Sequence, residues 1–110
     1  MHEEGRSGIY NATPYRSMLE VECTAERFTV RHSLYGIRGT TIIDIPVAAI
    51  TQVCLRRSIM MLFARCIEVE FVDSGQQRKT LLFGSFKKRQ WLAAFAQAGI
   101  NVLPQQPLRV

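Results

Sequence analysis

Basic side chains gather in three segments of this sequence that connect regular elements. Grouped cations attract phosphate and other anionic groups, and cations beside an apolar run are typical of loops that dip into anionic membranes. The basic residues are Arg38, then Arg56, Arg57 and Arg65, then Lys87, Lys88 and Arg89; the apolar run is Ile59, Met60, Met61, Leu62 and Phe63. These types and spacings predict a patch for an anionic ligand or a partner, with the apolar run as its contact loop.

Each cluster also has a simpler interpretation. Residues 87–89 can form a plain solvated face. Cations in the first turn of a helix oppose its macrodipole by about 0.3–1 kcal/mol each, which raises the chance of a purpose for them, but we favour the solvated face. Residues 59–63 can pack beneath a helix, and we favour this interpretation because exposed apolar patches of that size require a partner.

Catalytic and metal-ligating patterns do not stand out. His2 lies in a segment rich in Gly, Ser and charge, and His32 lies in a strand-like run without a Cys or His neighbour at ligand spacing. No Ser-His-Asp or Cys-His signature is present. Trp91 lies on an apolar helical stripe and is expected in the core rather than in a ligand site. We therefore expect a binding module that is not an enzyme, with no catalytic residue, metal or cofactor.

The three cysteines predict a compartment. Cys23, Cys54 and Cys66 are odd in number, lack a Cys-x-x-Cys spacing and lie in apolar, strand-like runs, so we expect reduced, buried thiols. The longest apolar run is far shorter than the ~20 residues of a spanning helix. No apolar segment of a secretory signal follows Met1. These features favour a cytoplasmic protein, with attachment to the inner face of the membrane as an alternative.

The charge is positive but unevenly distributed. The net charge is +5 and the isoelectric point is about 9.6, yet residues 1–26 contain five Glu against two Arg. A basic chain favours nucleic acid as a partner. The basic residues here lack the interleaved exposed aromatic side chains of a stacking platform, so we do not expect nucleic-acid binding.

The sequence pattern predicts one mainly β domain of 110 residues. Residues 1–16 are expected to be a flexible arm with at most one short strand, residues 17–99 the folded domain and residues 100–110 a tail. Apolar alternation predicts strands near residues 18–23, 27–32, 40–45, 51–57, 65–72 and 78–83.

A helical period follows the last strand. Ser85 is the expected N-cap and Gly99 the expected glycine just past the helix end, with Ile100 as the apolar residue after it. The helix has an apolar stripe that must pack against the sheet. The residues expected in the core are Phe28, Val30, Ile43, Ile45, Val53, Ile67, Val69, Phe71, Leu92 and Phe95, with Trp91 where the helix meets the sheet.

Four segments, in this order and spacing, resemble the pleckstrin-homology domains of bacteria. They are Thr24–Val30 (Thr-x-x-Arg and alternating apolar residues), 34–36 with its glycine, Ile45–Val53 (Ile-Pro-x-x-x-Ile-x-x-Val) and Trp91–Leu92. The likeness covers roughly residues 17–99. It implies a split or half-open β-barrel of six to seven antiparallel strands, with an amphipathic helix that plugs one end.

The resemblance leaves the function open, because this fold serves lipid binding, protein docking and assembly. Members that bind phosphoinositides place basic loops at the end opposite the helix. In an up-and-down sheet, turns 24–27, 46–50 and 73–77 share that end, and they are nearly neutral here. Loops 34–39, 56–65 and 84–89 share the helix end and hold the basic residues. The likeness to the phosphoinositide-binding members is therefore weak.

Protein contacts are the leading functional expectation. Unpaired strand edges either are protected or pair with another strand, and the resemblance implies self-assembly, because bacterial members form rings. We therefore expect protein–protein contacts, including homo-oligomerisation. The alternative is peripheral attachment to anionic membrane lipid through the basic patch at the helix end.

Overall fold

The computed structural model describes residues 1–34, 37–62 and 64–109, without the side chains of Leu34, Arg38 and Arg109. No helix in this part of the chain has the length and apolar composition needed to cross a bilayer. The elements are β1 (His2–Tyr10), β2 (Thr13–Cys23), β3 (Arg27–Leu34), β4 (Ile37–Pro46), η1 (Val47–Ala49), β5 (Ile50–Ser58), η2 (Ile59–Met61), β6 (Arg65–Val72), β7 (Arg78–Phe83), α1 (Lys88–Gln97) and β8 (Gln106–Arg109).

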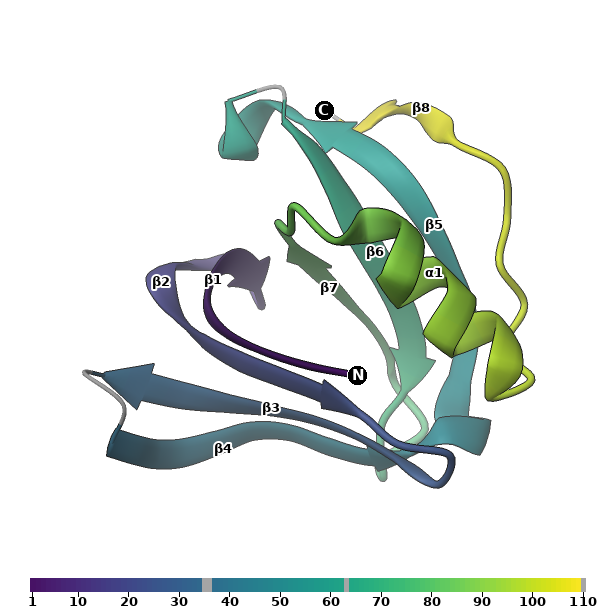
Figure 1. Ribbon diagram of the computed structural model, residues 1–110, viewed down its shortest axis with the longest axis horizontal. Helices are drawn as coiled ribbons and strands as arrows, with labels where there is room; N and C mark the ends of the chain where they lie inside the picture. Colours follow the sequence, from purple (N-terminus) through teal and green to yellow (C-terminus); the bar gives the residue numbers. More distant parts are fainter. Residues whose placement is uncertain (35–36, 63, 110) are drawn as a thin grey trace.

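The strands form one eight-stranded sheet in the order β4-β3-β2-β1-β7-β6-β5-β8. Neighbouring strands are antiparallel except β5 and β8, which are parallel. The sheet bends strongly but does not close into a barrel (Figure 1). A mainly β domain with one C-terminal helix is confirmed. The expected six or seven antiparallel strands are wrong in number and kind, because β1 and β8 complete a mixed sheet.

Strand β1 differs most from the flexible arm that we expected for residues 1–16. It pairs with β2 from His2 to Tyr10, and its last three residues, Gly8–Tyr10, also pair with β7. A hydrogen bond from the Gly84 N–H to the Ser7 carbonyl, 2.9 Å long, extends this junction. Strand β1 therefore joins the half of the sheet that contains β2–β4 to the half that contains β5–β8.

Glycine is required where β1 meets β7. A Cβ atom at Gly8 would lie 2.5 Å from the carbonyl oxygen of Leu82 and 2.7 Å from a methyl carbon of Leu19. The first contact is with backbone, which cannot move without breaking the strand pairing. The small residues that suggested a loose segment are thus needed for close approach.

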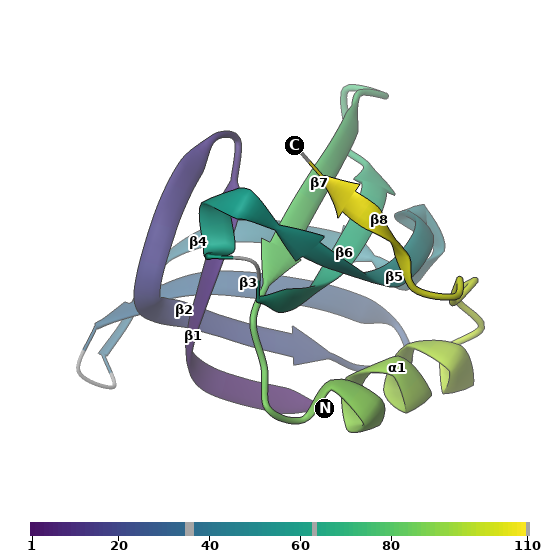
Figure 2. The same cartoon turned by 90° about the horizontal axis from the view of Figure 1, so that it is seen from above.

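The described part of residues 100–110, which we expected to be a tail, follows the edge of β5 as far as residue 109. The Val53 N–H donates to the Asn101 carbonyl, and the Leu103 N–H donates to the Val53 carbonyl, at 2.9 and 2.8 Å. Ile100 is buried in the core. β8 then lies parallel to β5 (Figure 2). The chain therefore covers the edge of β5 with its own backbone.

Helix α1 ends as the sequence predicts but begins differently. Gly99 has φ +84°, its N–H donates to the Ala96 carbonyl and the Ile100 N–H donates to the Phe95 carbonyl, which is a Schellman ending. Ser85 is not the N-cap, which is Lys87. The Ser85 hydroxyl instead accepts a 2.9 Å hydrogen bond from the Lys87 N–H and donates one to the Glu3 carboxylate. Ser85 therefore links the start of the helix to β1.

The predicted core is confirmed apart from one residue. Leu92 is only partly buried at the edge of the core; the others, namely Phe28, Val30, Ile43, Ile45, Val53, Ile67, Val69, Phe71, Trp91 and Phe95, are buried. The Trp91 ring centroid lies 5.3 Å from that of Phe83, edge to face, and 5.6 Å from that of Phe95. Trp91 is therefore the contact between α1 and the sheet.

Replacing Trp91 tests this packing. Trp91→Ala should lower the free energy of unfolding by about 3–5 kcal/mol, because the cavity has no neighbour free to fill it. Urea titration followed by circular dichroism measures the change. Leu92→Ala, on the same helix but partly exposed, should cost clearly less. Equal losses in the two variants would contradict the central position of Trp91.

Candidate functional site

Turns 24–27, 46–50 and 73–77 lie at one end of the molecule, as expected, but the C-terminal end of the helix also reaches this end. Arg27, Ala48 and Asp73, one from each turn, line a common groove. Ala98, which follows α1, lines a hollow with Val47 of the same end. The expectation that this end lies away from the helix is therefore wrong. A helix of ten residues is about 15 Å long, and its buried side chains must lie along the sheet rather than at one end.

The loops at the other end bring most of the predicted basic residues together. Arg57 and Arg65 are exposed and occupy directly opposite positions on β5 and β6. Arg65 and Lys88 line the same hollow. Lys87 and Arg89 are exposed beside them, at the start of α1. The first helical turn carries no acidic residue to balance this charge.

Two of the predicted basic residues do not belong to this group. The Arg56 side chain is mostly buried, with Nε 2.8 Å from a carboxylate oxygen of Glu68, and it donates a 2.9 Å hydrogen bond to the Pro107 carbonyl. Arg56 therefore fastens β8 to β5 and β6. The side chain of Arg38 lies outside the described residues.

The described part of the apolar run, residues 59–62, does not pack beneath the helix as we favoured. Met60 exposes 65% of its surface and Leu62 88%, and Ile59 is also exposed. Among these four residues only Met61 turns inward, towards Gly84. Leu62 adopts a left-handed conformation, φ 56°, which costs a non-glycine residue about 1–2 kcal/mol. Phe63 lies outside the described residues. The described loop therefore holds apolar side chains in solvent.

Sequence reasoning missed Phe86, the most exposed large apolar residue of the described chain at 95%. The Arg6 guanidinium lies 5.9 Å from its ring centroid. The sequence did contain a signal for this exposure: Phe86 is outside the apolar helical stripe and directly precedes the basic residue Lys87. We define the basic–apolar rim as the exposed apolar residues Ile59, Met60, Leu62 and Phe86 with the basic residues Arg57, Arg65, Lys87, Lys88 and Arg89.

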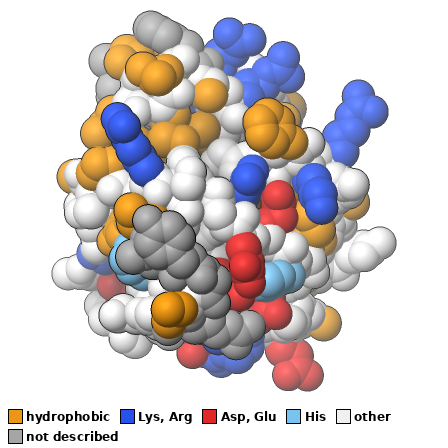
Figure 3. Space-filling model, turned by 60° about the vertical axis from the view of Figure 1, so that its left-hand side comes forward, with side chains coloured by type: hydrophobic (Ala, Val, Ile, Leu, Met, Phe, Trp, Pro, Cys, Tyr) orange, Lys and Arg blue, Asp and Glu red, His pale blue; other side chains and the backbone are white. Residues whose placement is uncertain are grey.

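Charge is unevenly distributed over the face shown in Figure 3. Most of its Lys and Arg side chains lie in the upper part, together with hydrophobic ones, and the acidic side chains lie in the middle and lower parts. The upper part corresponds to the top of Figure 1, where η2 lies. The loops of the rim therefore differ in charge from the surface around β1 and β2.

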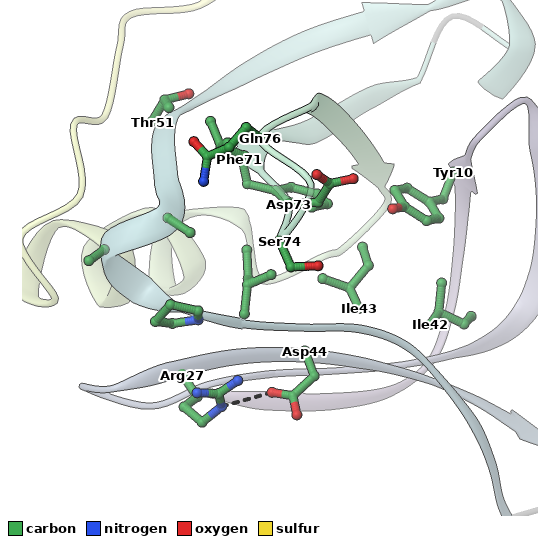
Figure 4. A pocket seen from close by; sticks show the side chains of 15 residues that line it. Tyr10, Arg27, Ile42, Ile43, Asp44, Thr51, Phe71, Asp73, Ser74 and Gln76 are labelled. Carbon is green, nitrogen blue, oxygen red and sulfur yellow. Dashed lines mark hydrogen bonds and ion pairs between the residues drawn. The ribbon is translucent and has the colours of Figure 1, made fainter.

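A second candidate site is a groove of about 710 Å³ between β4 and the turn that joins β6 to β7. The rings of Tyr10 and Phe71 stack at its side, with their centroids 6.1 Å apart, and Ile42 also lines the groove (Figure 4). The Arg27–Asp44 ion pair, with 2.8 Å between Nε and the carboxylate oxygen, lies at the mouth of this groove. Burial, followed by the nearby negative charge of Asp73, raises the pKa of Tyr10. This groove combines an apolar wall with hydrogen-bonding groups.

Side chains that could ligate a cation meet on β1 and β2. Potential ligand atoms of His2, Glu4 and Glu20 lie within 4.8 Å of one another, and His2 Nε2 lies 2.7 Å from a carboxylate oxygen of the buried Glu20. Arg31 also lies 3.9 Å from Glu20 and competes with a cation. The sequence hid this cluster because its residues meet only through the pairing of two strands.

Glu3 connects β1 to the helix. It lies opposite the core residue Val21, so its carboxylate points into the molecule, where it accepts hydrogen bonds from the Trp91 indole N–H and the Ser85 hydroxyl. Arg6 Nε lies 3.8 Å from its second oxygen. These contacts fix the start of α1 and thereby the position of residues 84–89. The N terminus lies beside α1 in Figure 2.

The comparisons with known proteins add no identification. Neither the known family models nor the curated protein sequences include a match to this chain.

Removing the Glu3 carboxylate tests its structural role. Glu3→Ala leaves two buried donors without their acceptor, and we expect the free energy of unfolding to fall by about 1–3 kcal/mol. Urea titration measures the loss. Glu4→Ala, at the next position of β1 but exposed, is the matched control and should change little. If the Glu3 variant is as stable as the Glu4 variant, Glu3 does not stabilise the contact between β1 and α1.

The cysteines are buried thiols, as expected. Burial raises the pKa of Cys23 and Cys66, and burial followed by the negative charge of Glu68 raises the pKa of Cys54. A raised pKa leaves less of the reactive thiolate at a given pH.

The folded protein should therefore react slowly with a thiol reagent at pH 8, and all three thiols should react rapidly in denaturant. Absorbance of the released chromophore follows both reactions. Rapid, stoichiometric labelling of any cysteine under native conditions would show that its strand face is accessible.

Proposed function

We propose that this protein is a non-enzymatic binding module with a pleckstrin-homology-like fold that acts through protein contacts, including pairing with a second copy of itself. The observation that carries this proposal is the edge of β4. The groove beside β4 supports a binding role, because its lining combines apolar side chains with hydrogen-bonding groups.

The strand order supports the likeness to the pleckstrin-homology fold. Strands β1–β4 follow one another in the sheet, β5–β7 do the same in the other half, and α1 comes after β7. The Thr-x-x-Arg segment forms a turn in which the Thr24 hydroxyl accepts the Arg27 N–H at 3.0 Å. Pro46 ends β4 before the turn of η1. A strongly bent sheet of this kind corresponds to the half-open barrel of the resemblance.

The edge of β4 is long and only partly protected, by irregularities in its pairing with β3, by Asp44 and by Pro46 at its end. Among the described residues no strand pairs with its outer side, although β4 has ten residues. Thr40 and Thr41 are exposed there, Ile37 is exposed nearby, and Asp44 is the charged side chain of β4 that the structure describes. Edge strands that stay single are usually short, charged or interrupted by proline. An edge like that of β4 is suited to accept another strand.

The opposite edge of the sheet is blunted. β8 has four residues, including Pro107, which has no N–H to donate. It also covers β5, the longer strand behind it. Strand addition at this edge is therefore less favourable than at β4.

A second copy of the chain suits the free edge of β4. Two β4 strands that meet antiparallel about a two-fold axis present the same surface to each other, so one self-complementary contact forms twice. Such pairing continues the sheet through main-chain hydrogen bonds. The groove with Tyr10 and Ile42 lies beside this edge and can take side chains from the added strand.

Lysines on the edge test the pairing. Sedimentation velocity of the parent protein should show a dimer at high concentration. Thr40→Lys with Thr41→Lys should raise its dissociation constant by about tenfold or more, because like charges meet across the axis. Thr13→Lys with Gln105→Lys adds the same charge at exposed positions away from β4 and is the control.

A parent protein that stays monomeric at the highest attainable concentration would contradict self-pairing. Equal dimerisation of the edge variant and the control would place the interface elsewhere. Circular dichroism confirms that both variants are folded.

A further inference from the structure

We propose that the basic–apolar rim is a docking surface for an anionic lipid bilayer. This inference goes beyond the proposed protein contacts, since it concerns the opposite end of the sheet from the groove and uses different residues. It rests on the charge, the exposure and the arrangement of two loops, of which the structure describes residues 57–62, 64–65 and 84–89.

The rim carries charge of one sign. Residues 57–62, 64–65 and 84–89 contain five basic side chains and no Asp or Glu. Arg57 and Arg65 are placed directly opposite each other, where like charges repel. Lys87 and Lys88 lie at the end of α1 where the helix dipole disfavours cations. An opposing anionic surface would relieve both repulsions.

The apolar residues stand at the tips of the same loops. Leu62 and Met60 project from the β5–β6 connection, and Phe86 projects from the connection between β7 and α1. Apolar tips with basic neighbours can enter the boundary between headgroups and acyl chains while the cations stay with the headgroups.

The two loops form one surface. Phe86 and Lys88 line a hollow together with Ala64 and Arg65. Met61 reaches towards Gly84 from behind the tips. Glu3 and Ser85 hold the second loop from beneath, so the cations and apolar tips are presented on a fixed framework.

A bilayer suits this surface better than a single bound anion. Arg57, Arg65, Lys87 and Arg89 are exposed and spread along the rim, and the partly buried Lys88 already donates an ammonium hydrogen to the Ser85 carbonyl. A soluble phosphate needs several donors directed at one point, whereas a charged membrane attracts every cation within a Debye length. The proposal therefore commits to an anionic bilayer, with little preference among headgroups.

Vesicle co-sedimentation tests the proposal with the whole chain. The protein should sediment with vesicles of phosphatidylcholine and phosphatidylserine at low salt, and far less with vesicles of phosphatidylcholine alone. Lys87→Gln with Arg89→Gln should weaken binding by about 30-fold. Arg78→Gln with Lys79→Gln removes the same charge near the β6–β7 turn and should have a much smaller effect.

The apolar tips have their own test. Leu62→Ser and Phe86→Ser should each weaken binding to the anionic vesicles by about tenfold, since each removes apolar surface from the lipid contact. These side chains are exposed, so the melting temperature should not change. High salt should weaken the vesicle binding of both the parent protein and the Ser variants, because charge attraction brings all of them to the membrane.

Three results would overturn the proposal. The first is a parent protein that stays in the supernatant with anionic vesicles at low salt. The second is an equal loss of binding in the rim variant and the Arg78–Lys79 control, which would reduce the effect to net charge. The third is full displacement from vesicles by millimolar inorganic phosphate at constant ionic strength, which would indicate a site for a soluble anion. Loss of self-association in Leu62→Ser, without any vesicle binding, would assign the rim to contacts between copies instead.

Discussion

The close approach of β1 to β7 is the contact on which the rest of this structure depends. β1 is paired with β2 on one side and with β7 on the other, so it is the one described strand that belongs to both halves of the sheet. Gly8 permits the approach. Without β1, β2–β4 and β5–β8 would share only the contacts of α1 and the core side chains. The bend that creates the inner face for Trp91 and Phe95 therefore depends on this strand.

Polar groups on both faces of this bent sheet serve as connections between elements. Glu3 connects β1 with α1, and Glu68 with Arg56 connects β6 with β5 and, through a carbonyl, with β8. Buried charges cost free energy unless they are paired, so each pair is specific to one arrangement of its strands. The hydrophobic core alone would tolerate small shifts of these elements. The positions of the rim loops thus follow from a few polar contacts beneath them.

Apolar periodicity was sufficient to predict the six strands β2–β7, the helix and nearly all of the core, because it reports which side chains face inward. Residues 1–16 carry glycine and charge for reasons that only the three-dimensional structure reveals: Gly8 for close packing and Glu3 for the helix. Glu68 lies between the inward-facing Ile67 and Val69 and is therefore on the outer face, yet Arg56 covers it. The exposure of Leu62 could not be predicted, because an apolar run has the same sequence pattern whether its side chains pack into the core or extend into solvent.

The two edges of the sheet differ, and this difference limits how far any edge-to-edge assembly can grow. β8 and Pro107 occupy one edge, so the chain offers a single edge, β4, for strand addition. A contact that uses the same edge in both partners consumes every available edge when two copies meet. A ring or a fibre would instead need β4 of one copy to join β8 of the next. If copies pair through β4 as proposed, β8 disfavours continuation of the sheet at the other edge, so this pairing favours a finite complex over an endless sheet.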